Sequence, residues 1–232
     1  MAATRTGKTR KPASTKQRTA NRPKRTALRT RDPVATRQRI LDAATREFAR
    51  LGFGGARVDA IAKRAKANKR MIYHYFGNKN HLFLAVLESA YGSIRTAEQA
   101  LDLEHLEPED ALRTLTEFTW QYYLAHPEFL TLVNSENLHK ARHLKQSRIV
   151  GGMFSALVDM VRKILQRGVR KGVFRKGIDP VQLNITIAAI GYYYFTNRFT
   201  GSIIFKRDLM APKALKQRLA FNVETIMRLV RK

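Results

Sequence analysis

The side chains best suited to chemistry are cations and hydrogen-bonding rings gathered in one short run: Arg57, Lys69, Arg70, Tyr73, His74, Tyr75 and Lys79. Guanidinium and ammonium groups donate hydrogen bonds to guanine edges and phosphates, and tyrosine hydroxyls contact the nucleic-acid backbone. The spacing provides no nucleophile with a matching base. The run therefore predicts contacts with DNA rather than catalysis.

Two short helices separated by a tight turn must hold these side chains. In the first helix, 58–65, apolar residues recur at helical spacing: Val58, Ile61, Ala62 and Ala65. In the second helix, 69–76, Ile72 and Phe76 point inward, which leaves the cations and rings outside. Asn68 is placed to cap the second helix by accepting a backbone N–H. A short helix with such an outer face fits the DNA major groove.

A longer helix is expected before this pair, over residues 36–51. Its apolar face consists of Ile40, Leu41, Ala44, Phe48 and Leu51. Thr36 is the expected N-cap, and Gly52 is expected to end the helix. Three helices in such quick succession have the size of a helix-turn-helix module. We therefore place a three-helix DNA-binding domain over residues 34–80.

The chain is strongly basic along its whole length. Its 232 residues include 44 Lys and Arg against 18 Asp and Glu, a formal net charge of +26. Residues 1–32 contribute +10 of this charge and the remaining residues +16. An excess of this size favours polyanionic partners such as DNA, RNA or an acidic membrane surface.

The N-terminal segment, residues 1–33, has almost no large apolar side chains and is rich in Thr, Lys, Arg, Ala and Pro. Such a segment cannot bury enough surface to offset its chain entropy, so we expect a disordered basic tail. Two roles are equally compatible with it. It is either an arm that neutralises DNA phosphates or a solvated tail without influence on site choice.

Residues 81–232 contain further helical segments, with no convincing strand and no internal repeat. Helices are expected from behind Asn78 to about residue 100, then over 109–125, 128–138, 148–170, 180–198 and 212–230. The 180–198 helix is apolar nearly all round and must therefore be buried on every side. One domain covers one face of that helix, and a partner subunit is the simplest cover for the other.

Composition excludes several other classes of protein. Cysteine is absent, so there is no disulfide framework and no thiolate metal site. No run approaches the ~18 apolar residues of a membrane span, and no apolar segment follows the N-terminal charges as in a secretory signal. Paired carboxylates, a nucleophile elbow and a phosphate loop are not recognisable. We expect a cytoplasmic protein that is not an enzyme and needs no cofactor, metal or membrane.

Four motifs lie between Thr36 and Leu87: Ile40-Leu41-Asp42-Ala43-Ala44, Phe48-Ala49-Arg50-Leu51-Gly52-Phe53, Ile61-Ala62-Lys63-Arg64-Ala65 and Ile72-Tyr73-His74-Tyr75-Phe76-Gly77-Asn78-Lys79. In this order and spacing they resemble the DNA-binding domain of the TetR family of bacterial repressors. Two positions depart from the family pattern. Lys66 stands where a turn glycine is usual, which suggests local strain, and Arg57 replaces a hydroxyl residue that would cap the second helix.

The resemblance implies an all-α protein, with the helix-turn-helix domain followed by a helical ligand-binding and dimerisation domain over residues 81–232. It implies a homodimer formed through the last two long helices. A small-molecule effector in the second domain would change the separation of the two recognition helices and release a palindromic operator in double-stranded DNA. Half-sites about 34–36 Å apart fit two such helices on one face of the duplex.

The resemblance also implies individual DNA contacts. Tyr73, His74 and Tyr75 match positions that touch DNA, and Lys79 matches a phosphate-binding lysine. From their place at the start of the second helix, Lys69 and Arg70 are candidates for guanine contacts, and Arg57 is a candidate for a phosphate contact. A packing role for Tyr75 and a solvated ring for His74 remain the alternatives.

Residues that combine rings with polar groups inside apolar segments are candidates for the ligand pocket: Phe118, Trp120, Tyr122, Tyr123, Asn134, Asn137, His139 and Tyr193. For any single one of them, an ordinary place in the core or in solvent is the alternative. His139 and His143 have the i, i+4 spacing of a metal site on a helix, but no third ligand is evident and no metal is predicted.

The apolar stripes of the last two long helices supply the expected dimer interface: Leu183, Ile187, Ile190, Tyr194, Leu219, Val223 and Ile226. A sequence-specific, ligand-responsive repressor is thus the preferred interpretation. The alternative is a sequence-neutral architectural DNA-binding protein driven by the basic tail. Removing residues 1–33 would abolish DNA binding by such a protein, whereas a repressor would keep its site choice with a weaker salt dependence.

Overall fold

The computed structural model describes residues 1–4, 7 and 32–232, and residues 32–232 form one compact unit. In this described part the chain is all helical apart from connections and an isolated bridge between Phe174 and Arg231. The all-α fold class is confirmed. The tail expected over residues 1–33 lies almost entirely outside the described residues.

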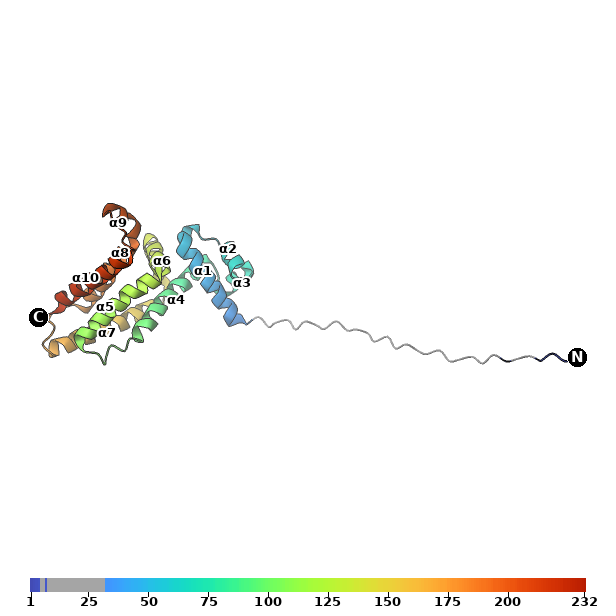
Figure 1. The fold of residues 1–232 in the computed structure, drawn as a ribbon, viewed down its shortest axis with the longest axis horizontal. Coiled ribbons are helices and arrows are strands. Elements are labelled where there is room, and N and C mark those ends of the chain that lie inside the picture. Colours follow the sequence, from blue (N-terminus) through green and yellow to red (C-terminus); the bar gives the residue numbers. More distant parts are fainter. Residues whose placement is uncertain (5–6, 8–31) are drawn as a thin grey trace. The chain divides into compact units, whose positions relative to one another are not determined.

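The unit contains these elements in chain order: α1 (Pro33–Gly55), α2 (Val58–Arg64), α3 (Lys69–Phe76), α4 (Lys79–Gln99), α5 (Pro108–Ala125), α6 (Pro127–Leu138), the 3-10 turn η1 (Leu144–Gln146), α7 (Val150–Arg170), α8 (Pro180–Thr196), α9 (Arg198–Ile204) and α10 (Pro212–Val230). Helices α1, α2 and α3 gather at one end of the unit (Figure 1). Helices α5, α7, α8 and α10 pack at the other end, and α4 and α6 contact both groups.

The N-terminus of α1 differs from its expected form. Asp32, not Thr36, caps the helix, because its carboxylate accepts hydrogen bonds from the N–H groups of Val34 (2.9 Å) and Ala35 (3.3 Å). Thr36 lies inside the first turn and is buried. At the other end Gly52 takes a positive φ of 65°, which kinks α1 at the position where its end was predicted.

The three N-terminal helices close over a shared core. Ile40, Phe48, Ile61 and Ile72 are fully buried in it. Glu47 is also buried, and its carboxylate lies 3.5 Å from Arg50 and 3.6 Å from Arg64, so an ion-pair cluster joins α1 to α2. The bounds of α3 agree with the predicted 69–76, and its orientation is set by this core.

The turn between α2 and α3 confirms the backbone strain suggested by Lys66. Its φ is 51°, in the left-handed region. The Lys66 N–H donates to the Lys63 carbonyl (3.2 Å) and the Ala67 N–H to the Ala62 carbonyl (3.0 Å). This pair of bonds is a Schellman motif, in which glycine is the usual residue at the Lys66 position. At the start of α2, Arg57 makes no side-chain capping bond, as its residue type led us to expect.

Helices α4 and α6 belong to both halves of the unit. Asn78 caps α4 by accepting from the His81 N–H at 2.9 Å, as predicted. The first half of α4 contributes Leu82 and Phe83 to the N-terminal core, whereas Ile94, three turns later, packs in the C-terminal half. Leu132 of α6 also lies in the N-terminal core. A movement of either helix therefore affects the packing of both halves.

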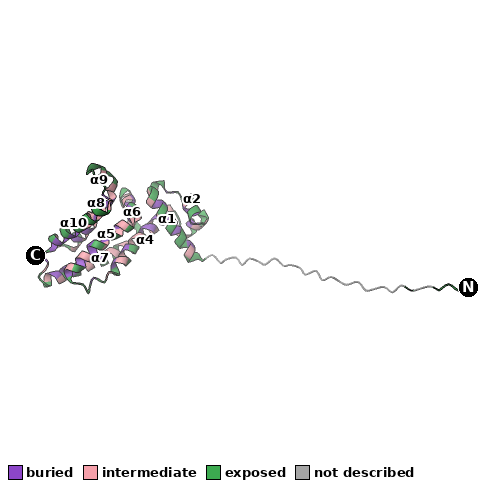
Figure 2. Cartoon of the chain, viewed as in Figure 1, coloured by how far each residue is buried: buried purple, intermediate pink, exposed green. Residues whose placement is uncertain are grey.

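The C-terminal helices bury one side of α8 and leave the other side open. Leu183 and Ile187 pack inside the chain, while Val181, Ile185 and Tyr193 are exposed. The expected 180–198 helix ends earlier, at Thr196, because the backbone changes at Asn197, and α9 follows as a separate, unpredicted and largely exposed helix (Figure 2). Among the described helices, none is long and apolar enough to cross a membrane.

Candidate DNA interface and internal pocket

The outer face of α3 presents four side chains to solvent, because Ile72 and Phe76 anchor its inner face in the core. The four are Lys69, Arg70, Tyr73 and His74. Asn68 fixes the start of the helix by accepting from the Met71 N–H at 2.9 Å. The backbone of α3 is thus held at both ends while its polar face stays open to a ligand as large as DNA.

Lys69 and Arg70 differ in whether they form an ion pair within the described part of the chain. Lys69 Nζ lies 3.0 Å from Asp59 of α2, and the hydrogen bond with Asp59 raises the pKa of Lys69. Within residues 32–232 Arg70 takes part in no ion pair. A base contact by Lys69 would therefore require it to leave Asp59, whereas Arg70 has no such competitor there. Arg70 is the stronger candidate for a bidentate guanine contact.

Tyr75 and Lys79 are partly buried residues with packing roles. The Tyr75 ring lies edge-on to His74, with 5.2 Å between centroids, and packs on the N-terminal core. Lys79 Nζ sits 4.7 Å from the centre of the Phe53 ring, and burial lowers the pKa of this lysine. Arg57 is exposed at the N-terminus of α2. The packing alternative for Tyr75 is compatible with a DNA contact at its exposed edge.

A buried polar junction connects α6 to the N-terminal helices. The Phe53 N–H donates to Ser135 Oγ at 3.1 Å. The Glu136 carboxylate lies 2.6 Å from His143 Nδ1 and accepts from the backbone N–H of His143 at 2.8 Å. His143 Nε2 in turn lies 3.2 Å from Asn80 Oδ1 of α4. These bonds tie α6 to α1 and α4.

The two histidines considered for a metal site serve this junction instead. Nδ1 of His139 lies 2.7 Å from the Ser135 carbonyl oxygen, and the His139 ring packs edge-on to Phe53. The His143 ring packs against Phe53 and Phe83. In the described part of the chain no group of three or more His, Asp or Glu side chains is arranged to hold a metal ion.

A pocket of about 330 Å³ lies between α4, α5, α6, α7 and α8. This volume is in the range of small-molecule sites. Aromatic rings make up much of its wall: Tyr91, Tyr123, Phe129, Phe154 and Tyr192. Its polar lining consists of Arg95 and Glu98 from α4, Thr119 from α5 and Asn184 from α8.

Arg95 and Glu98 form an ion pair in this pocket, with 2.9 Å between Nη2 and Oε1. Only 12% of the Arg95 side chain and 4% of the Glu98 side chain are exposed. Burial raises the pKa of Glu98 to about 7, with Arg95 opposing the shift, and burial lowers the pKa of Arg95. Sequence reasoning missed this pair, although an Arg and a Glu at i, i+3 on the helix behind Asn78 were a usable signal.

Few of the residues predicted for the ligand pocket reach it. Tyr123 lines it. Asn134 does not, but its side chain accepts a hydrogen bond from the hydroxyl of Tyr192, which does line the pocket. Trp120 is core, with its ring 4.4 Å from that of Phe195. The others lie outside the lining: Phe118, Tyr122, Asn137, His139 and Tyr193. Their polar groups made them candidates, but helix orientation points them elsewhere.

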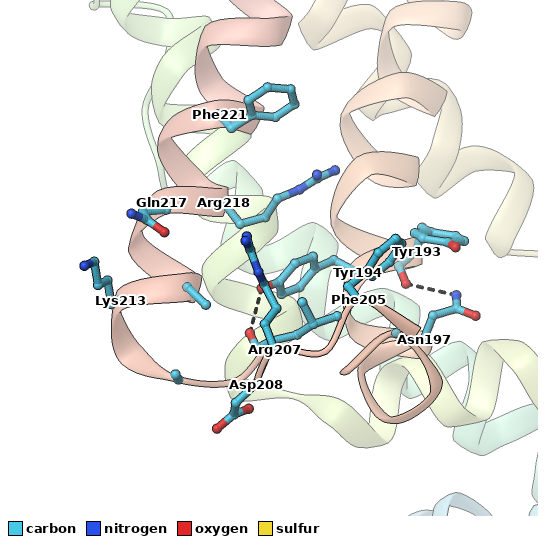
Figure 3. A pocket seen from close by; sticks show the side chains of 14 residues that line it. Tyr193, Tyr194, Asn197, Phe205, Arg207, Asp208, Lys213, Gln217, Arg218 and Phe221 are labelled. Carbon is cyan, nitrogen blue, oxygen red and sulfur yellow. Dashed lines mark hydrogen bonds between the residues drawn. The ribbon is translucent and has the colours of Figure 1, made fainter. Parts of the chain in front are cut away.

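A larger hollow of about 880 Å³ lies on the surface between α8 and α10 (Figure 3). Its walls include the exposed rings of Tyr193, Phe205 and Phe221. Tyr194 and Leu209 also line it, and the Tyr194 hydroxyl donates to the Leu209 carbonyl at 2.6 Å. Because large exposed rings line it, we interpret this hollow as a surface groove rather than as the small-molecule site.

The residues predicted for the subunit interface lie largely inside the single chain. Leu183, Ile187, Tyr194, Val223 and Ile226 are buried within the single chain, and Ile190 and Leu219 pack against its core. A side chain already buried by its own subunit has little surface to offer a partner. The apolar stripes that we selected therefore hold α8 and α10 in the subunit, and exposed rings lie on the outer faces of the two helices.

Comparison with known proteins decides the family. The profile of bacterial regulatory proteins of the tetR family matches residues 40–86, and that of tetracyclin repressor-like C-terminal domains matches residues 108–226. The HTH-type transcriptional repressor NicS of Pseudomonas putida is 39% identical over 209 residues, covering 90% of this chain and 99% of NicS. The chain belongs to the TetR family.

Other relatives of this TetR-family chain agree. The regulator RutR of Escherichia coli is 27% identical over 89% of this chain and 94% of its own. The crystal structure of a transcriptional regulator from Streptomyces coelicolor, SCO4942, superposes with a TM-score of 0.64 at 26% identity, covering 84% of this chain and 98% of that one. The predicted DNA-binding transcriptional repressor with a ligand-binding C-terminal domain is confirmed, and the family consists of regulators rather than enzymes.

Proposed function

We propose that this TetR-family repressor acts in the cytoplasm as a homodimer that binds a palindromic operator and leaves it when a small molecule fills the 330 Å³ pocket. The observation that carries the proposal is the polar outer face of α3, held on a rigid apolar anchor. Family membership supports DNA binding and an effector-responsive second domain. We place the DNA-binding domain over residues 34–80 and the effector domain over 81–232, with α4 shared between them.

Each polar residue of the first domain has a proposed role at the operator. Arg70 reads a guanine, and Lys69 joins it after exchanging Asp59 for DNA. Tyr73 and His74 contact the backbone and base edges beside them. Three partly engaged or peripheral residues hold the register on phosphates: Arg57, Tyr75 and Lys79. Half-sites about 34–36 Å apart, or multiples of a turn, suit two such helices.

Helix α6 is the proposed link between effector and DNA. Phe129 and Val133 of α6 line the pocket, and Ser135, two residues after Val133, bonds the Phe53 backbone. A ligand that moves α6 thus disturbs the junction of this helix with α1 and α4. The separation of the two α3 helices in a dimer would change with it, and effector and operator would weaken each other's binding by the same factor.

The outer faces of α8 and α10 are the proposed dimer interface. Tyr193 and Phe221 are about 60% exposed, and α9 adds the exposed Phe199, Ile203 and Ile204. Large exposed apolar side chains gathered on neighbouring helices are typical of interaction sites, and aromatic residues dominate interface energies. The nearly all-apolar α8 supports the same interpretation, because only a partner can cover its outer side.

The proposal is tested by measuring binding to the DNA beside the protein's own gene in gel shifts. Tyr73→Ala and Arg70→Ala should each weaken specific binding by tenfold or more, since one good base contact is worth about 1–3 kcal/mol. Lys63→Ala, an exposed cation at the end of α2, serves as the matched control. All three variants should keep the melting temperature of the wild type. Equal affinity for unrelated DNA would refute operator recognition, and a large loss of thermal stability in Tyr73→Ala would identify Tyr73 as a core residue.

The architectural alternative makes a different prediction for the same experiment. If the basic tail alone drove binding, removing residues 1–31, which leaves the Asp32 cap of α1 in place, would abolish it. For the repressor, we expect the truncated protein to keep its operator preference and to show a shallower dependence of affinity on salt, because fewer counterions are released. Titrations at several salt concentrations separate the two outcomes.

A further inference from the structure

The Arg95 guanidinium in the pocket has more donors than partners. It carries five N–H bonds, and Glu98 engages only Nη2. Its Nε and Nη1 atoms are buried and, among the described residues, have no hydrogen-bond partner. Each of these two atoms shares one edge of the planar guanidinium with Nη2, and such an edge binds a carboxylate through two parallel bonds once Glu98 releases Nη2.

The walls around Arg95 suit a flat ring. The Phe154 ring lies over the guanidinium, with its centroid 5.2 Å from Cζ. Tyr91 lies edge-on between Phe154 and Phe129, at centroid distances of 5.3 and 5.5 Å. Burial raises the pKa of Tyr91 to about 12 and that of Tyr192 above its ordinary range, so both hydroxyls stay neutral. These rings offer aromatic contacts and the Tyr91 hydroxyl as a hydrogen-bond donor, but no further charge.

The charge balance of the pocket limits the ligand to one negative charge. The charged groups that line it are Arg95 and Glu98 of α4, while the lining residues from α5, α6, α7 and α8 are neutral. A doubly charged phosphate would lie beside a single cation, Arg95, and beside the carboxylate of Glu98, so its charge would not be balanced. A carboxylate requires only that Glu98 gives way, and burial already favours its protonated form, with a pKa of about 7.

We propose that the effector is a small aromatic carboxylate, bound with its carboxylate on the Arg95 guanidinium and its ring between Tyr91, Phe154 and Tyr192. This proposal rests on the proposed function, since it names the effector class of the same pocket. On binding, the carboxylate replaces Glu98 at Nη2 of Arg95 and also takes Nε, and Glu98 takes up a proton from solvent. The proton leaves again when the ligand dissociates.

The first test compares acids with their neutral amides by calorimetry on the full chain without DNA. The probes are benzoate, 4-hydroxybenzoate and 1-naphthoate, each beside its amide. At least one acid should bind, tenfold or more tightly than its amide, because charge-assisted bonds to arginine are replaced by neutral ones. Equal or tighter binding of the amides would overturn the proposal, and so would the absence of binding by all three acids up to millimolar concentration.

Substitutions locate the site. Arg95→Gln should abolish the preference for acids, and Arg95→Lys should keep part of it because the charge remains without the fork. Arg162→Gln is the matched control, since Arg162 pairs with Asp159 at i, i+3 on the exposed face of α7. Melting curves verify folding. If Arg95→Gln does not fold, the Arg95→Lys comparison decides, and undiminished acid preference in that variant would refute the role of the guanidinium.

Proton uptake provides an independent readout. In buffers of different ionisation enthalpy, acid binding to the wild type near pH 8 should be accompanied by uptake of up to one proton, and in Glu98→Gln this uptake should vanish. Uptake unchanged in Glu98→Gln would refute the exchange. A gel shift with the operator separates ligand binding from control of DNA binding. An acid that binds through Arg95 but leaves DNA affinity unchanged would refute control by effector, whereas the anion site would stand.

Discussion

Lys66, in the turn between α2 and α3, has a backbone conformation that residues with a Cβ atom disfavour. Its φ of 51° lies in the left-handed region, which L residues avoid at a cost of about 1–2 kcal/mol. The Schellman bonds of α2 fix that conformation, so the strain is present in every folded molecule. The departure from glycine noticed in the sequence therefore has a structural consequence.

Replacing Lys66 by glycine should stabilise the protein. We expect Lys66→Gly to raise the free energy of unfolding by about 0.5–1 kcal/mol, the relief of strain being partly offset by the greater freedom of glycine in the unfolded chain. Urea denaturation measures the change. Lys66→Ala, which removes the charge but keeps the Cβ, is the control. A stabilisation of equal size in Lys66→Ala would show that charge, not backbone strain, is responsible.

Glu98 should make stability depend on pH. Burial raises its pKa from 4.5 to about 7 in the folded state, so between these values the folded state binds more protons than the unfolded state. The contribution of Glu98 to stability thus falls as pH rises from about 4.5 to about 7. Relative to Glu98→Gln, which cannot titrate, the wild type should lose roughly 1–3 kcal/mol over this window.

Urea unfolding of both proteins at pH 4.5 to 8 measures this difference, and the other carboxylates cancel because both proteins share them. A parallel pH dependence of the two proteins would mean that Glu98 titrates normally and that the Arg95 pair is better solvated than its burial suggests.

Helix α7 depends on one small residue where it meets the segment that follows it. Gly168 is buried, and a Cβ placed there would overlap the Phe174 ring. Phe174 is itself buried in the C-terminal core and its backbone N–H donates to the Gly168 carbonyl at 3.1 Å. The close approach therefore requires glycine for space rather than for an unusual φ.

We expect Gly168→Ala to lower the free energy of unfolding by about 1–3 kcal/mol, the usual cost of overpacking a core. Gly152→Ala in the same helix is the control, since its added methyl group meets nothing within 4 Å. That control should be neutral or slightly stabilising, because alanine is the better helix former. Thermal melts compare the two. If Gly168→Ala and Gly152→Ala were destabilised to a similar extent, the cause would be substitution within α7 in general rather than a clash with Phe174.

Helix α8 illustrates how one element serves three environments. Its inner side supplies Leu183 and Ile187 to the core, its flank supplies Asn184 and Tyr192 to the pocket, and its outer side exposes Tyr193. This threefold use explains why the helix is apolar nearly all round. Apolarity alone did not reveal which side faced which neighbour.

For the whole molecule, the exposed rings of α8 and α10 predict a dimer that one buried charge disrupts. Phe221→Glu should shift the protein from dimer to monomer at micromolar concentration, because a carboxylate would be desolvated at the interface without a partner. Analytical ultracentrifugation measures the mass. Leu138→Glu is the control, since Leu138 is also an exposed apolar residue but lies at the end of α6. An unchanged Phe221→Glu dimer would place the interface elsewhere.

Periodicity and capping residues in the sequence determined the helical fold. Ile72 and Phe76 oriented α3, Asn68 and Asn78 marked helix starts, and the four motifs from Ile40 to Lys79 led to the family. These features are local: a helix face and a cap depend on residues within one or two turns, so the sequence specifies them directly.

Tertiary structure alone decided which neighbour each face meets. It brought Arg95 and Glu98 into an aromatic pocket, paired Lys69 with Asp59, and buried Leu183 and its stripe inside the subunit. A stripe of apolar residues shows that a face is buried, but the partner that buries it is set by packing among segments distant in the chain. For the same reason the polar face of α3 was evident in the sequence and the proposed effector site was not.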